Sequence, residues 1–76
     1  MGSPTIRHLE QAEFTAIMPV IAHAGAVFGD QEKAMHWLRS PLGILEGRTP
    51  MEVLRMAGGI ARIETILTRI EHNIPS

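Results

Sequence analysis

The sequence contains no cysteine and no tyrosine, and aromatic residues make up only 4% of its 76 residues. The absence of cysteine excludes disulfides and zinc sites with thiolate ligands, and it fits a cytoplasmic protein. Strand-rich domains rely on aromatic and β-branched residues. A chain whose core must come from aliphatic residues and five methionines therefore favours an all-α fold.

A charge excess and long apolar runs are also missing. The formal net charge is -1, without the basic excess of a nucleic-acid-binding domain, so we expect no direct DNA binding by this chain. No run approaches the ~18 apolar residues that a membrane helix needs, and the first residues lack the features of a signal peptide. A chain of this length buries only roughly 60% of its unfolded surface, so we expect a partner chain to add stability.

The spacing of apolar residues predicts helices over residues 14–28, 31–40, 50–56 and 60–72, with an ordered loop at 42–47. Pro19 fits the first turn of a helix, so the regular part of the first helix is expected to begin near Met18. The expected fold is a compact all-α bundle of four to five short helices. Its folded domain covers residues 14–76, and residues 1–13 form a lead-in segment that is helical or in part a remnant of cloning.

Several residues predict where the helices begin and end. Asp30 is typical of an N-cap, because its carboxylate accepts backbone N–H groups of the next turn. The segment 49–52, Thr-Pro-Met-Glu, has the pattern of a capping box with proline at the first helical position. The glycine pair at 58–59 predicts a break, and Asn73 predicts a left-handed C-cap. Trp37 is expected to anchor the core.

No catalytic constellation is evident. There is no Ser–His–Asp or Cys–His arrangement, and no pair of carboxylates suited to acid–base catalysis. The four histidines form no zinc pattern, and Glu32 with His36 would supply only two ligands on one helix face. The glycine pair at 58–59 is not followed by the Lys and Ser/Thr of a phosphate-binding loop. We therefore predict a protein that is not an enzyme, with no cofactor and no metal.

An ordered set of short motifs from Phe28 onward resembles a known family. The motifs are Phe28-Gly29-Asp30, Ala34, Trp37-Leu38, Ser40-Pro41, Leu45, Gly47-Arg48-Thr49-Pro50, Val53-Leu54 and Arg69-Ile70-Glu71-His72. Their order and spacing resemble the C-terminal toxin-binding domain of the Xre/MbcA/ParS-type bacterial antitoxins, over about residues 26–76. The chain departs from the family where Leu42-Gly43 stands in place of the common Asn-Pro, and where Asn73 stands in place of the glycine that often ends the last helix.

The resemblance implies an antitoxin of a type II toxin–antitoxin system. Antitoxins of this family typically neutralise toxins with the RES fold, which act on NAD, and their C-terminal helix and tail cover the toxin's NAD pocket. Many members also carry an N-terminal helix-turn-helix domain, which a chain of this length is too short to contain as well. The alternative is a homodimeric or regulatory module without a toxin-blocking role, since symmetric dimers are the commonest small assemblies.

The candidate contacts with the partner fall into two groups. Arginine, which outnumbers lysine six to one here, is enriched at interfaces because its planar guanidinium makes paired hydrogen bonds; a solvated face with local pairs such as Glu52–Arg55 is the competing interpretation. In the tail, Glu71 and the carboxylate after Ser76 are predicted to occupy phosphate subsites of the pocket. The predicted partner-binding residues are Arg48, Arg62, Arg69, Glu71, His72, Asn73, Ile74, Pro75 and Ser76.

Overall fold

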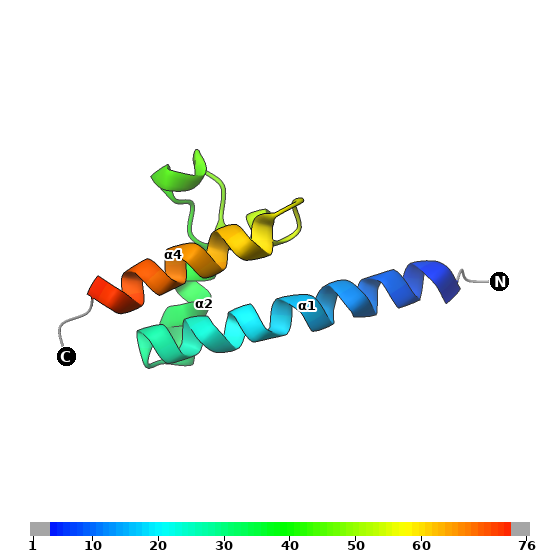
Figure 1. Ribbon diagram of the computed structural model, residues 1–76, viewed down its shortest axis with the longest axis horizontal. Helices are drawn as coiled ribbons and strands as arrows, with labels where there is room; N and C mark the ends of the chain where they lie inside the picture. Colours follow the sequence, from blue (N-terminus) through cyan, green and yellow to red (C-terminus); the bar gives the residue numbers. More distant parts are fainter. Residues whose placement is uncertain (1–3, 74–76) are drawn as a thin grey trace.

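The computed structural model describes the backbone of residues 4–73 and the side chains of residues 12–73. Its helices are α1 (Pro4–Phe28), α2 (Gln31–Arg39), the short 3-10 turn η1 (Gly43–Leu45), α3 (Pro50–Leu54) and α4 (Gly59–Asn73). Helices α1 and α4 lie side by side, and α2 crosses them on one side (Figure 1). The described residues form no strand, so the predicted all-α fold is confirmed.

Helix α1 differs from the prediction, because it runs without interruption from Pro4 to Phe28 and contains Pro19 in its interior. The expected start near Met18 is therefore wrong. A proline inside a helix removes one hydrogen bond and crowds the preceding turn. Pro19 has no N–H to donate to the Thr15 carbonyl, and both residues are exposed to water. Ile17 and Val20, on either side of the proline in sequence, are buried. Burial on both sides of Pro19 keeps the helix continuous.

Helix α2 begins and ends as the sequence predicts. The Asp30 carboxylate accepts a hydrogen bond from the Glu32 backbone N–H at 3.0 Å, and the helix ends at Arg39, before Ser40 and the proline that follows. Trp37 is only partly buried, and its ring lies against Phe28 with centroids 5.5 Å apart. It therefore packs at the edge of the core rather than at its centre.

Helix α3 begins with the predicted capping box, which is confirmed in full. The Glu52 N–H donates to the Thr49 hydroxyl at 3.1 Å, and the Thr49 N–H donates to the Glu52 carboxylate at 2.9 Å. The helix ends at Leu54, earlier than expected, because the Met56 N–H turns back to the Val53 carbonyl at 2.9 Å.

The glycine pair at 58–59 separates helix α3 from helix α4, as predicted. Gly58 has a φ of +71°, and at Gly59 a Cβ atom would lie 1.6 Å from the Val53 carbonyl oxygen. The first residue of α4 thus touches the backbone of α3. At its other end α4 includes Asn73, and Glu46 is the non-glycine residue with positive φ in the described part of the chain. The prediction of a left-handed cap at Asn73 is therefore wrong. Ile70, in the last turn of α4, packs against the core, and this packing keeps the helix regular as far as Asn73.

The core is formed by α1, α2, α3 and α4 together, with α4 packed against α1 and α3. On α4, Ile63 and Leu67 are fully buried, and Ile60 and Ile70 flank them on the same stripe, as the sequence periodicity predicts. The other buried apolar residues are Ile17, Val20, Ala24, Val27, Ala34, Leu38, Leu45, Val53 and Leu54.

Among the described residues no single helix is long and apolar enough to span a membrane. Only α1 and α2 taken together reach that length and composition, and the two helices are bent by 117° relative to each other.

Candidate partner-binding surface

Helix α4 carries its charged side chains on two opposite flanks. Seven residues are about two helical turns, so side chains at that spacing share a face. Glu64 and Glu71 form one such pair, and both contact His23 on α1. Arg62 and Arg69 form the other pair, and Arg62 reaches η1 on the far side. The acidic flank of α4 therefore faces α1, and the basic flank faces away from it.

His23 links α1 to the acidic flank of α4. Its Nδ1 atom lies 2.7 Å from the Glu64 carboxylate, and its Nε2 atom lies 3.5 Å from the Glu71 carboxylate. The hydrogen bond to Glu64 raises the pKa of His23, partial burial opposes this, and the longer contact with Glu71 adds to it. The contact with Glu64 thus joins two residues that are 41 positions apart in sequence, and Glu71 points toward α1.

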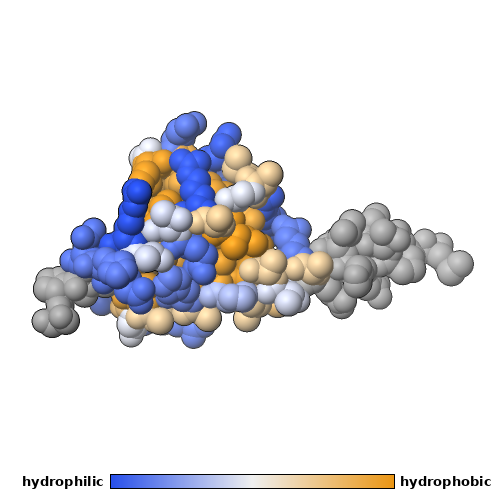
Figure 2. Space-filling view, viewed as in Figure 1, coloured by the Kyte–Doolittle hydropathy of each residue, from blue (hydrophilic) through white to orange (hydrophobic). Residues whose placement is uncertain are grey.

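The basic flank meets a ridge of exposed apolar side chains. The Arg62 guanidinium donates to the Ile44 carbonyl at 3.1 Å, and the Arg48 guanidinium lies 3.7 Å from the Met56 sulfur. Ile44 is 58% exposed and Met56 is 43% exposed. We name these four residues the η1 ridge. Figure 2 shows apolar surface at the top of the molecule, over η1, bordered by strongly hydrophilic side chains.

The structure separates the predicted partner-binding residues. Arg48 contacts Met56 and Arg62 contacts Ile44, so each arginine touches an exposed apolar residue of the η1 ridge. Arg69 lies two turns farther along the same flank of α4 as Arg62. Glu71 lies on the opposite flank. His72 and Asn73 are exposed at the end of α4, and Ile74, Pro75 and Ser76 lie outside the described residues.

Arg55 and Glu52 do not form the local ion pair that the competing interpretation of the arginines offered as an example. The Arg55 Nε atom instead lies 3.7 Å from the Glu13 carboxylate on α1. The Glu52 carboxylate accepts the Thr49 backbone N–H, and this hydrogen bond lowers the pKa of Glu52. Its geometry is fixed by the capping box, so it cannot also turn toward Arg55.

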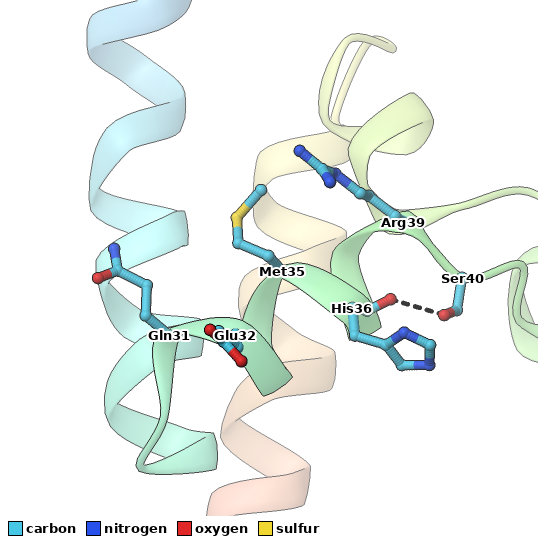
Figure 3. A pocket seen from close by; sticks show the side chains of 6 residues that line it. All are labelled: Gln31, Glu32, Met35, His36, Arg39 and Ser40. Atoms are coloured by element: carbon cyan, nitrogen blue, oxygen red, sulfur yellow. Dashed lines mark hydrogen bonds between the residues drawn. The ribbon is translucent and has the colours of Figure 1, made fainter.

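The outer face of α2 carries a shallow hollow (Figure 3). Six side chains from one helix and its C-cap line it, namely Gln31, Glu32, Met35, His36, Arg39 and Ser40. The Ser40 hydroxyl donates to the His36 carbonyl at 2.6 Å, which ties it to the helix end. In the described part of the chain no group of three or more His, Cys, Asp or Glu side chains is placed to hold a metal ion. The hollow thus presents mixed polar and apolar surface without a metal-ligand cluster.

Comparison with known proteins gives a family. The model of the antitoxin Xre/MbcA/ParS C-terminal toxin-binding domain matches residues 23–72, which is more than half of the chain. The protein named Antitoxin Xre from Pseudomonas putida (strain KT2440) is 39% identical over 51 residues, which are 67% of this chain and 32% of that relative. The match thus spans about a third of the relative's length. No solved structure matches the chain significantly.

The matched residues begin at His23 and include the η1 ridge and α4 as far as His72. The first part of α1, with Phe14 and Met18, precedes them. The chain therefore belongs to the Xre/MbcA/ParS antitoxin family and carries its C-terminal toxin-binding domain.

Proposed function

We propose that this chain neutralises a RES-type toxin by binding over the toxin's NAD site, and that it catalyses no reaction itself. The observation that carries the proposal is the family match over residues 23–72. The free end of α4 adds support, because Arg69, His72 and Asn73 are exposed there. Figure 1 shows the last turn of α4 extending past the corner where α1 meets α2. A projecting helix end can enter a concave site that a flat surface cannot reach.

The proposed contacts at this end are Arg69, His72, Asn73 and the three residues that follow. Arg69 can pair with a carboxylate at the rim of the toxin's pocket. Ile74 and Pro75 give the tail apolar surface, and proline limits the entropy lost when the tail becomes ordered. Glu71 contributes as a phosphate mimic only if its 3.5 Å contact with His23 opens. We therefore assign the tail, more than Glu71, to the pocket.

The test first asks whether the reading frame adjacent to this chain encodes a RES-domain protein, and it then uses that protein as the toxin. Its consumption of NAD is measured with increasing amounts of the purified chain, and growth rescue is measured in cells that express both proteins. We expect the wild-type chain to stop NAD consumption and restore growth. Arg69→Glu and a bulky C-terminal extension should each weaken neutralisation, whereas Lys33→Glu on α2 makes the same change of charge far from the site and should not. Full neutralisation by the extended chain would contradict occlusion by the tail.

We also propose that the chain acts in the cytoplasm and does not bind DNA directly. Its net charge of -1 gives little attraction to a polyanion. Fluorescence anisotropy with operator DNA from its own locus tests this. Binding by the isolated chain at physiological salt would overturn the proposal.

Self-association is a second candidate function, and one observation favours it. Phe14 and Met18 are four residues apart on α1 and are 63% and 44% exposed, which places two large apolar side chains on one face. A symmetric dimer would cover this face. Light scattering with size exclusion should then give a dimer mass for the wild type and a monomer mass for Phe14→Ser. A monomeric wild type would exclude this candidate.

A further inference from the structure

We propose that the η1 ridge is a second contact surface for the toxin, in which Ile44 and Met56 make the apolar contacts and Arg62 is a positioning residue. The inference rests on the proposed function and adds a surface away from the tail. It also changes the role of Arg62, which the sequence predicts to contact the partner directly. In the structure, its guanidinium is engaged with the Ile44 carbonyl at 3.1 Å.

The fold holds Ile44 outward on a fixed turn. In a 3-10 helix there are three residues per turn, so neighbouring side chains point about 120° apart. Leu45 is 1% exposed and fastens the turn to the core, which leaves Ile44 facing solvent. The Gly47 N–H donates to the Leu42 carbonyl at 2.9 Å, and the Leu42 N–H donates to the Arg48 carbonyl at 3.1 Å. The turn is thus closed at its base by backbone hydrogen bonds.

Arg62 supplies the tie between this turn and α4. The contact spans 18 residues in sequence. A side chain that is ordered before binding loses less entropy when a partner covers it. Arg62 therefore presents Ile44 to the partner without needing to touch the partner itself.

Met56 gives the ridge a second apolar side chain. It lies in the connector before α4, where the Arg48 guanidinium contacts its sulfur. Methionine is flexible and polarizable, so it adapts to the shape of an opposing surface. Methionine and arginine are both enriched at protein interfaces relative to the rest of the surface.

The charges of the ridge favour a protein surface with an acidic rim. Among the described residues, neither Arg48 nor Arg62 has a carboxylate within 4.0 Å. Glu52 lies nearby, but its carboxylate is held by the Thr49 N–H, and Glu46 is exposed beside the turn. The complementary partner is an apolar depression bordered by carboxylates. We assign it to the toxin because Arg69, near the proposed tail contact, lies on the same flank of α4 as Arg62.

The decisive test removes the two apolar side chains of the ridge one at a time. Met56 is 43% exposed and Ile44 is 58% exposed, and the control residue Lys33 is exposed on α2. Binding to a catalytically inactive form of the RES-domain toxin used in the test of the proposed function is measured by calorimetry. We expect Met56→Ala to raise the Kd about fivefold and Ile44→Ala to raise it at least about tenfold. Lys33→Ala should leave the Kd within about twofold. Circular dichroism should show the same melting temperature for Ile44→Ala and wild type.

The role of Arg62 is tested by a double-mutant cycle. If Arg62 acts through Ile44, Arg62→Ala weakens binding in the wild-type background but adds little to Ile44→Ala. Hydrogen exchange of the amides at 43–47 should also become faster in Arg62→Ala. Additive losses of affinity would overturn the positioning role.

The outcomes separate this inference from the function on which it rests. If the wild type binds and both Ile44→Ala and Met56→Ala bind equally well, the ridge is not a toxin contact, while the proposed function stands. If the wild type does not bind the toxin, the proposed function fails and this inference fails with it.

Discussion

The close approach of α4 to α3 at Gly59 gives the sharpest prediction about stability. A Cβ atom at this position would lie 1.6 Å from the Val53 carbonyl oxygen and 2.7 Å from its carbon. Ordinary contact begins at 3.4 Å, and the oxygen cannot swing aside because it accepts the Met56 N–H at 2.9 Å. In Gly59→Ala the start of α4 must therefore retreat by roughly 1.5–2 Å, which no side-chain rotation can avoid.

This retreat would loosen the packing of Val53 and Leu54, which are both buried. Overpacking alone costs about 1–3 kcal/mol, and partial exposure of two apolar side chains adds to it. We expect Gly59→Ala to lose about 3–4 kcal/mol of unfolding free energy. A chain of this length has a total of roughly 4–11 kcal/mol, so the loss is a large part of its stability.

Urea denaturation followed by circular dichroism and by Trp37 fluorescence measures the loss, and two other glycines serve as controls. Gly58→Ala keeps open space around its Cβ but has a φ of +71°, so it should cost about 1–2 kcal/mol. Gly25 lies inside α1 with nothing within 4 Å of its Cβ, so Gly25→Ala should stabilise by about 0.5–1 kcal/mol. Equal effects of the changes at Gly58 and Gly59 would refute the steric argument.

Three further predictions use the same assay. His23→Gln should cost about 0.5–1 kcal/mol, since the carboxylates it contacts are partly exposed. Because the pKa of His23 is raised in the folded state, this loss should be full below about pH 6.5 and vanish as the pH rises through the folded pKa; a pH-independent loss would contradict the charged pair. Thr49→Ala should cost about 1 kcal/mol, whereas Thr68→Ala, which removes only a bond back to the Glu64 carbonyl, should be nearly neutral. Pro19→Ala should stabilise by about 1–3 kcal/mol, and an unchanged midpoint would argue against a continuous α1.

The features that the sequence predicts correctly are those that depend on a few neighbouring residues. The Asp30 cap and the capping box at Thr49 each satisfy backbone N–H groups within three residues. The break at the glycine pair is equally local, although its cause is partly tertiary. Gly58 is needed for its φ, but Gly59 is needed because the backbone of α3 passes against it, and no pattern in the sequence reports that contact.

The features that were missed depend on contacts between distant segments. The continuity of α1 through Pro19 follows from burial against other helices, which local propensity does not contain. His23 pairs with Glu64 across 41 residues, and Arg62 pairs with Ile44 across 18. The seven-residue spacing of Glu64 and Glu71 could have shown that they share one face of α4. Their common partner on α1 could not have been found without the fold.

The two flanks of α4 have different tasks, and this constrains how a partner can bind. The acidic flank is satisfied within the chain, because its two carboxylates meet His23. A partner that used this flank would have to replace the contacts between α1 and α4 and lose their contribution to stability. The basic flank has no such restriction, since among the described residues Arg62 is tied only to a backbone carbonyl. A toxin that approaches from the basic flank can therefore contact η1 and the end of α4 together while the interface between α1 and α4 stays closed.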